Sequence, residues 1–330
     1  MGHFYIIYSR CHGVRASHMS DIQLFRLSNG RATELSGQTA KLEKNLQNVV
    51  ESNMPTLIGV RFLATEYATG KTHKGRIDSL GLDENGCPVI IEYKRQSNEN
   101  VITQGLFYLD WLLDHRAEFR WLVMEKLGKE TANQIEWSGT RLLCIAADFT
   151  RYDQHAVQQI QRNIELIRYK LFDEDLLLLE LVNSQSIPDV TSAKPASQEL
   201  ARELSPEKSK AIGKDKSLKE QLALASPEIL ELHAQVTGYL FSLGEDVQEN
   251  HLKLYTAFRK IKNFACVIVY PGRLLIMLKL DSSSVTFEEG FSRDVSEIGH
   301  WGTGNVELIL RTLDDLERAK PLLALSYLNN

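Results

Sequence analysis

Residues 75–95 read GRIDSLGLDENGCPVIIEYKR, and this stretch decides the fold of the first half of the chain. Two mainly apolar runs, 75–82 and 88–95, flank the segment Asp83-Glu84-Asn85-Gly86. An Asn-Gly pair between two apolar runs is typical of the turn of a β-hairpin, because both residues tolerate positive φ. The stretch therefore predicts two adjacent antiparallel strands.

The predicted hairpin brings three charged side chains together. Asp78 and Glu92 each lie seven residues from Asn85, so pairing around the turn places them opposite each other, with Cβ atoms about 5 Å apart. Lys94 points to the same face as Glu92, because side chains alternate along a strand. Two adjacent carboxylates favour a hard cation such as Mg²⁺, and the ammonium beside them suits hydrolysis of a phosphodiester. The alternative is a cross-strand salt-bridge cluster on a solvated sheet face.

The sequence around the hairpin predicts an α/β domain with a mixed sheet. Apolar spacing and capping residues indicate, in chain order, a helix at 39–53, a strand at 57–66, the hairpin, a helix at 101–116, a strand at 140–147 and a long amphipathic helix at 153–170. Helices that alternate with strands in this way pack on both faces of one sheet.

A second, smaller α+β domain is predicted at 227–330. Ser226, Pro227 and Glu228 form a typical helix start. Strands follow at 264–270, 273–279 and 306–310, and a helix at 313–324 closes the chain.

Composition sets the other boundaries. Residues 184–226 are rich in Ser, Lys and Pro and poor in large apolar side chains, which predicts a flexible linker after a first domain at 20–183. The segment 15–19, Arg-Ala-Ser-His-Met, resembles a cloning scar, so residues 1–19 are expected to be a vector-derived leader.

The charge and cysteine content exclude several classes of protein. The net charge of −5 excludes a basic field over the whole chain, so a contact with DNA must come from a local basic strip or a bound metal. No apolar run approaches the roughly 20 residues that cross a bilayer. The four cysteines include no CxxC pair, which argues against a disulfide scaffold and favours a cytoplasmic location.

Further candidates lie on both sides of the hairpin. Glu43 is on the helix before the first strand, where its carboxylate can reach the same end of the sheet, although an exposed helix charge is an equal alternative. Gln104 and Tyr108 share one face of the following helix and can hold a phosphate or a lysine. Arg76, at the start of the first hairpin strand, and Arg95, at the end of the second, are candidate contacts to nucleic acid, as is Lys94.

The run GRID…EYK…QGLFY, between residues 75 and 108, resembles the PD-(D/E)xK nuclease superfamily in its RecB-like branch with a QxxxY helix. It is also similar to NucS-type endonucleases. The resemblance covers about residues 40–170 and implies a restriction-endonuclease-like core. By the family pattern, Asp78, Glu92 and the Tyr93 carbonyl hold the metal, Lys94 acts on the water, and Glu43 supports the metal ligands. One departure is Ile77, since proline commonly stands at that position in the superfamily.

The resemblance implies a nuclease that cleaves DNA with Mg²⁺ or Mn²⁺, in DNA repair or defence, with residues 227–330 as a recognition domain. Residues 227–330 resemble an uncharacterised C-terminal domain that follows such nuclease-like domains. Self-association as a homodimer is left open. The alternative is a catalytically silent nuclease fold that binds nucleic acid or protein. Proteins of this arrangement have also been loosely labelled transport-related, which the absence of a membrane span in the sequence does not support. Intact Asp78, Glu92 and Lys94 favour the enzyme, whereas the acidic net charge favours the binding module.

Overall fold

The structure, a computed structural model, describes residues 5–8, 22–40, 42–70, 74–95, 100–173, 175–182 and 216–330. The contacts divide the chain into two compact units. The first comprises Met1–Asn183 with Arg259–Phe264 and Leu328–Asn330, and the second comprises Ser184–Phe258 and Ala265–Tyr327. Most of the predicted leader and linker lies outside the described residues. Of the predicted leader, Tyr5–Tyr8 is described and forms a strand; of the predicted linker, Leu218–Leu224 is described and forms a helix.

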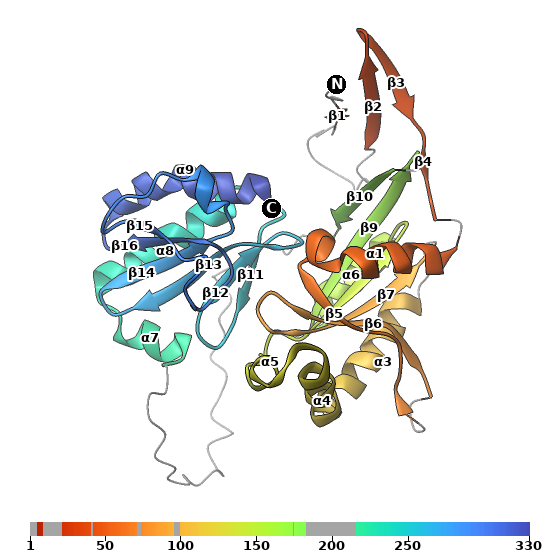
Figure 1. Cartoon of the computed structure of the whole chain (residues 1–330), viewed down its shortest axis with the longest axis horizontal. Coiled ribbons are helices and arrows are strands. Elements are labelled where there is room, and N and C mark those ends of the chain that lie inside the picture. Colours follow the sequence, from red (N-terminus) through yellow and green to blue (C-terminus); the bar gives the residue numbers. More distant parts are fainter. Residues whose placement is uncertain are drawn as a thin grey trace. The chain divides into compact units, whose positions relative to one another are not determined.

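The first unit is built around a mixed sheet (Figure 1). Its elements are β1 (Tyr5–Tyr8), β2 (Gln23–Ser28), β3 (Arg31–Leu35), β4 (Gly37–Gln38), α1 (Glu43–Ile58), β5 (Val60–Ala68), β6 (Arg76–Asp83), β7 (Pro88–Lys94), α3 (Asn100–Asp114), α4 (Arg116–Leu127), α5 (Lys129–Asn133), β8 (Arg141–Ala146), α6 (Arg151–Gln159), β9 (Asn163–Phe172) and β10 (Leu176–Leu181).

The sheet order is β10-β9-β8-β7-β6-β5, with β4 paired to β9. Strands β7, β8 and β9 run parallel, and the other neighbours in this sheet are antiparallel. The predicted hairpin is confirmed, because the pairs Ser79↔Ile91 and Leu82↔Pro88 have the register that places Asp78 opposite Glu92. The order helix, three antiparallel strands, helix, parallel strand is the expected mixed α/β core.

Helices cover both faces of this sheet (Figure 1). Leu46, Val50 and Met54 of α1 pack on one face, against Val89, Ile91 and Tyr93 of β7 and neighbouring strands. Apolar residues of α3 and α4, among them Trp111 and Phe119, pack on the other face. The hairpin is therefore buried on both sides, and only its ends reach the surface.

The predicted long helix at 153–170 is wrong. The helix α6 ends at Gln159, and the chain continues as β9, which is parallel to β8. Both faces of β9 are covered, since Ile164 and Ile167 lie in opposite core clusters. The polar residue Glu165 is paired with Arg141 in the interior, and the partly buried Arg168 is paired with Asp148 and Glu180.

The predicted boundary between the first helix and the first strand is also wrong. The helix continues past Asn53, whose φ of −133° interrupts it, and past Pro55 to Ile58. Pro55 is tolerated because it lies in the first turn of the segment that follows the irregular residue. Gly59, in the left-handed conformation with φ 64°, ends the helix, so β5 begins only at Val60.

The second unit is α+β, as predicted. Its elements are α7 (Leu218–Leu224), α8 (Pro227–Ser242), β11 (Gln248–His251), β12 (Thr256–Arg259), β13 (Asn263–Tyr270), β14 (Arg273–Leu278), β15 (Ser292–Asp294), β16 (Val306–Leu310) and α9 (Leu313–Asn329). The last residue of β12, the first two of β13 and the last two of α9 are counted with the first unit. The strands form an antiparallel sheet in the order β11-β12-β13-β14-β16-β15. Tyr239 of α8 donates a hydrogen bond to the carbonyl of Lys320 (3.1 Å), so α8 and α9 lie side by side. In the part of the chain that the structure describes, no helix is long and apolar enough to cross a membrane.

A buried charge cluster joins three strands at the turn end of the hairpin. The guanidinium of Arg141 donates to both oxygens of Glu165 (3.1 Å each) and its Nε lies 3.3 Å from Asp83 Oδ2. Arg141, Glu165 and Asp83 are each at most 3% exposed. Charges removed from water in this way are stable only in the presence of their partners.

We expect Arg141→Met to lower the free energy of unfolding by about 3–5 kcal/mol, because Asp83 loses its buried cation and Glu165 loses two hydrogen bonds. Urea denaturation at pH 7 measures the change. The control is Arg26→Met, which removes the exposed partner of Asp173 and should change stability by less than about 1 kcal/mol. Equal losses in the two variants would contradict a special role for the buried cluster.

Candidate active site

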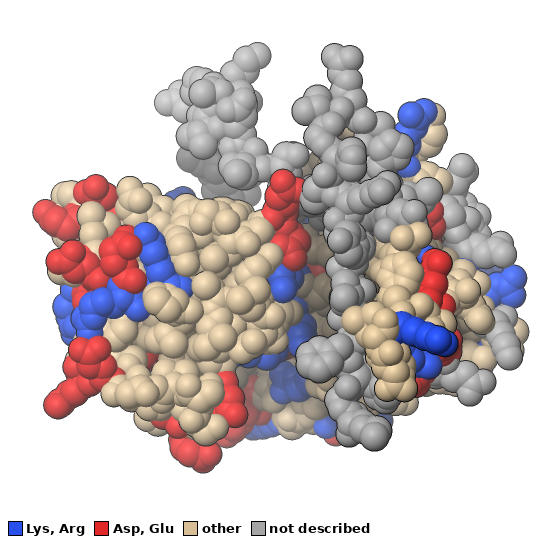
Figure 2. Space-filling model, turned by 90° about the horizontal axis from the view of Figure 1, so that it is seen from above, with Lys and Arg blue, Asp and Glu red and all other residues tan. Residues whose placement is uncertain are grey.

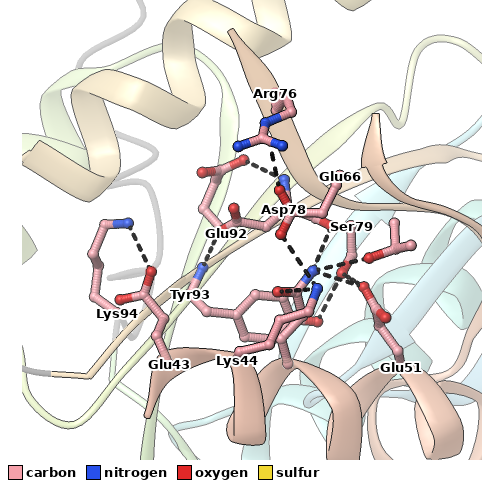
Figure 3. A network of polar contacts seen from close by, with 12 residues as sticks. Glu43, Lys44, Glu51, Glu66, Arg76, Asp78, Ser79, Glu92, Tyr93 and Lys94 are labelled. Carbon is pink, nitrogen blue, oxygen red and sulfur yellow. Dashed lines mark hydrogen bonds and ion pairs between the residues drawn. The ribbon is translucent and has the colours of Figure 1, made fainter. Parts of the chain in front are cut away.

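The carboxylates of Asp78 and Glu92 each accept a hydrogen bond from the main chain of the neighbouring strand. The amide of Asp78 donates to Glu92 Oε1 (3.2 Å), and the amide of Tyr93 donates to Asp78 Oδ2 (3.0 Å). Figure 3 shows the two carboxylates side by side at the end of the β6–β7 ladder. Each side chain thus satisfies a main-chain donor of the neighbouring strand, which fixes the direction in which both carboxylates point.

Burial and mutual repulsion make this pair difficult to ionise. Glu92 is fully buried, and its Oε2 atom has no hydrogen-bond partner among the described residues. Burial, with the nearby Asp78 carboxylate, raises the pKa of Glu92 to about 9. Burial also raises the pKa of Asp78, against the lowering effects of the Tyr93 amide and of Lys94. One proton shared by the two carboxyl groups relieves the repulsion.

Lys94 and Glu43 lie on the α1 side of this pair. Lys94 Nζ is 3.4 Å from Glu43 Oε1, and the Lys94 side chain is only 17% exposed. The other oxygen of Glu43 accepts from the amide of Arg95 (3.2 Å). The structure therefore brings Glu43 to the predicted end of the sheet, where it is paired with the lysine rather than exposed alone.

A second row of polar contacts extends from α1 and was not predicted from the sequence. The amide nitrogen of Gln47, a residue 3% exposed, lies 2.8 Å from the Asp78 carbonyl and 2.9 Å from Glu51 Oε1. Glu51 in turn accepts from the hydroxyl of Ser79 (2.6 Å). The signal was present in the sequence, because positions 43, 47 and 51 are four residues apart and share one helix face.

Two ion pairs of Glu66, next to Asp78 on the side of β5, were also not predicted from the sequence. Glu66 contacts Lys44 Nζ at 3.3 Å and Arg76 Nε at 3.7 Å. Glu66 adopts a left-handed conformation with φ 49° inside a strand, and such a conformation costs a non-glycine residue about 1–3 kcal/mol. No sequence signal distinguished Glu66, because its position depends on how β5 pairs with β6.

Tyr108 attaches α3 to the start of β6. Its hydroxyl accepts from the amide of Arg76 (3.2 Å) and from Gln104 Nε2 (3.4 Å), and the residue is 6% exposed. A Cβ atom on Gly75 would lie 2.5 Å from the ring of Tyr108, so this approach requires glycine. In the structure Gln104 and Tyr108 are thus linked to the strand that carries Asp78, and their predicted contact with a phosphate stays a prediction.

The donors present suit a small cation with few protein ligands. Among the described residues, no group of three or more His, Cys, Asp or Glu side chains is arranged to hold a metal. Asp78, Glu92 and the Tyr93 carbonyl stay the predicted oxygen donor set, and the carboxylates of Asp78 and Glu92 lie side by side (Figure 3). The buried Glu92 Oε2, without a hydrogen-bond partner in the described chain, is the observation that fits a cation. Mg²⁺ commonly binds one or two carboxylates and keeps several waters.

The chain has a relative that matches most of its length. No family model matches the chain. An "Uncharacterized protein" of Haemophilus influenzae is 30% identical over 302 residues, which cover 90% of this chain and 96% of the relative.

Solved structures that match about half of the chain include two nucleases. A "repair endonuclease from Pyrococcus abyssi" has 13% identity and a TM-score of 0.26, and the match covers 51% of this chain and 89% of that one. The "EndoMS-dsDNA2 complex" has 15% identity and a TM-score of 0.24, over 50% of this chain and 65% of that one. TM-scores this low do not establish a common fold.

The raised pKa of Glu92 gives stability a defined pH dependence. Between the ordinary pKa of 4.5 and about 9, the folded state holds a proton that the unfolded state has released, so stability falls as pH rises, by up to about 1.4 kcal/mol per pH unit. Glu92→Gln mimics the protonated form, so we expect it to be more stable than the unmodified chain at pH 8 and to have a flatter profile. Urea denaturation from pH 5 to 8.5 with a chelator measures this.

The control for that experiment is Glu317→Gln, which removes an exposed carboxylate on α9. Its stability profile should follow that of the unmodified chain. Parallel profiles for Glu92→Gln and the unmodified chain would contradict the raised pKa.

Proposed function

The chain belongs to the family of the Haemophilus influenzae protein, and we propose that it is a metal-dependent nuclease that hydrolyses phosphodiester bonds of DNA. The observation that carries the proposal is the pair formed by Asp78 and Glu92. Their carboxylates are adjacent, and a buried oxygen of Glu92 lacks a hydrogen-bond partner in the described chain. A cation bound beside this oxygen would supply the partner that it lacks.

Each residue of the site has a separate part in this proposal. Asp78, Glu92 and the Tyr93 carbonyl would hold Mg²⁺ or Mn²⁺, which supplies Lewis-acid stabilisation of the charge on the phosphate. The ammonium of Lys94 orients the attacking water and stabilises negative charge that develops in the transition state. Glu43 keeps Lys94 at the edge of the carboxylate pair through its contact of 3.4 Å. The proton of the carboxyl pair must leave before a cation can bind there.

DNA contact rests on a few cations near the site. The net charge is −5, and on the face shown in Figure 2 the basic side chains are interspersed with acidic ones. Arg76 has a side chain 70% exposed, and Arg95 is exposed at the end of β7. Both flank the carboxylates, where they can contact backbone phosphates. The second unit is proposed to assist recognition of DNA in repair or defence.

The test of the enzymatic proposal is the loss of Lys94. We expect Lys94→Ala to reduce the single-turnover rate of DNA cleavage by about 10²–10⁴, the usual effect of a positioned catalytic group. Lys94→Arg should not restore the rate, because the guanidinium is larger and its donors point differently. Cleavage of labelled single- and double-stranded DNA at saturating Mg²⁺ gives the rates.

Two controls accompany this measurement. Lys320→Ala removes a partly exposed lysine of α9 and should cleave at the unmodified rate. Asp78→Asn should weaken the binding of Mn²⁺ in calorimetry, whereas Lys94→Ala should bind it as well as the unmodified chain or slightly better. Equal rates for Lys94→Ala and the unmodified chain would reduce Lys94 to a salt-bridge partner. An unmodified chain that binds DNA without cleaving any nucleic acid would indicate the binding module instead.

A further inference from the structure

One carboxylate lies between two cations beside Asp78. Glu66 of β5 contacts Lys44 of α1 through one oxygen (3.3 Å) and Arg76 of β6 through the other (3.7 Å). Figure 3 shows the three side chains next to Asp78. The neighbouring pairs Thr65↔Ser79 and Tyr67↔Ile77 place Glu66 opposite Asp78. The two cations therefore belong to the immediate surroundings of the carboxylate pair but are not part of it.

Both cations are accessible from outside. The side chains of Lys44 and Arg76 are 49% and 70% exposed, and that of Glu66 is 36% exposed. Lys94 differs, because its side chain is only 17% exposed and it contacts Glu43. A ligand can therefore approach Lys44 and Arg76 directly, and the group it must displace is the Glu66 carboxylate.

Glu66 resembles the group that two such cations bind in nucleic acids. A carboxylate and a phosphodiester each carry one negative charge that is shared by two oxygens, and each oxygen can accept from a different cation. Lys44 also contacts the side-chain oxygen of Gln47 (3.0 Å), and the same amide group contacts the Asp78 carbonyl (2.8 Å). A phosphate held by Lys44 would thus lie at a fixed place relative to Asp78.

We propose that Lys44 and Arg76 form a binding subsite for a backbone phosphate of nucleic acid, next to the phosphate that is cleaved, and that Glu66 occupies this subsite in the free protein. The proposal rests on the nuclease function proposed above for the adjacent carboxylates. Nucleic acid binds only by displacing Glu66. Glu66 therefore weakens binding of the backbone, and the two cations are neutralised while no substrate is present.

The test is Glu66→Gln, measured as binding of fluorescein-labelled single- and double-stranded oligonucleotides in EDTA, where metal-dependent cleavage cannot occur. We expect the Kd to fall about 2- to 10-fold, since two exposed ion pairs no longer compete with the phosphate. The plot of log K against log salt concentration should become steeper by up to about 1. Glu66→Gly, which also relieves the left-handed conformation of residue 66, should give the same gain.

Two further variants decide whether the gain is local. Glu317→Gln changes the net charge by the same amount through an exposed glutamate of α9 and should leave the Kd unchanged. Adding Lys44→Gln and Arg76→Gln to Glu66→Gln should abolish the gain. An equal gain with Glu317→Gln, or no gain with either Glu66 variant, would overturn the subsite.

Cleavage assays with Mg²⁺ separate this proposal from the nuclease function. If the unmodified chain cleaves DNA but both Glu66 variants bind it no more tightly, the subsite fails and the nuclease function stands. If the Glu66 variants bind more tightly but no variant cleaves, the subsite stands as a nucleic-acid contact and the nuclease function fails.

Discussion

The register of the β6–β7 hairpin is the constraint on which the site depends. Asp83 Oδ1 accepts from the amides of Asn85 (2.9 Å) and Cys87 (2.8 Å), which fixes where the turn begins and ends. The other oxygen of the same carboxylate lies 3.3 Å from Arg141, so the turn is also attached to β8. A shift of one residue in the pairing would send Asp78 and Glu92 to opposite faces of the sheet.

Buried carboxylates lie at both the turn end and the open end of this hairpin, but their surroundings differ. At the turn end, the oxygens of Asp83 and Glu165 lie against the guanidinium of Arg141. At the other end, Glu92 retains a buried oxygen without a hydrogen-bond partner in the described chain. A folded protein tolerates such a group when the rest of the domain supplies enough stability. Asp83 Oδ2 also lacks a hydrogen bond in the described chain, but the Nε atom of Arg141 lies 3.3 Å from it.

The central part of the site was predictable from the sequence because it depends on local pairing. The spacing around Asn85 was sufficient to place Asp78 opposite Glu92, and the i, i+4 rule related Gln104 to Tyr108. The strand β9 was not predictable in the same way. Its polar residues Glu165 and Arg168 are paired with charges from other strands, so their burial depends on contacts between distant segments.

The same reason explains why Glu66 was missed. Its relation to Asp78 follows from the pairing of β5 with β6, and that pairing includes an irregularity between Phe62 and Ala64. The sequence contains no turn signal that would fix the register of these two strands. The end of α1 was mispredicted because Pro55 normally ends a helix, whereas here it lies early in the segment that continues to Ile58.

The position of α1 has a consequence for how this family can change length during evolution. Glu43, Gln47 and Glu51 reach Lys94, the Asp78 carbonyl and Ser79 from one helix face. A single residue inserted between Glu43 and Glu51 would turn part of this row by about 100° and remove it from the strands. Insertions after Asn53, where the helix is already irregular, would leave the row in place. Homologous chains should therefore vary in length beyond Asn53 and keep a constant spacing before it.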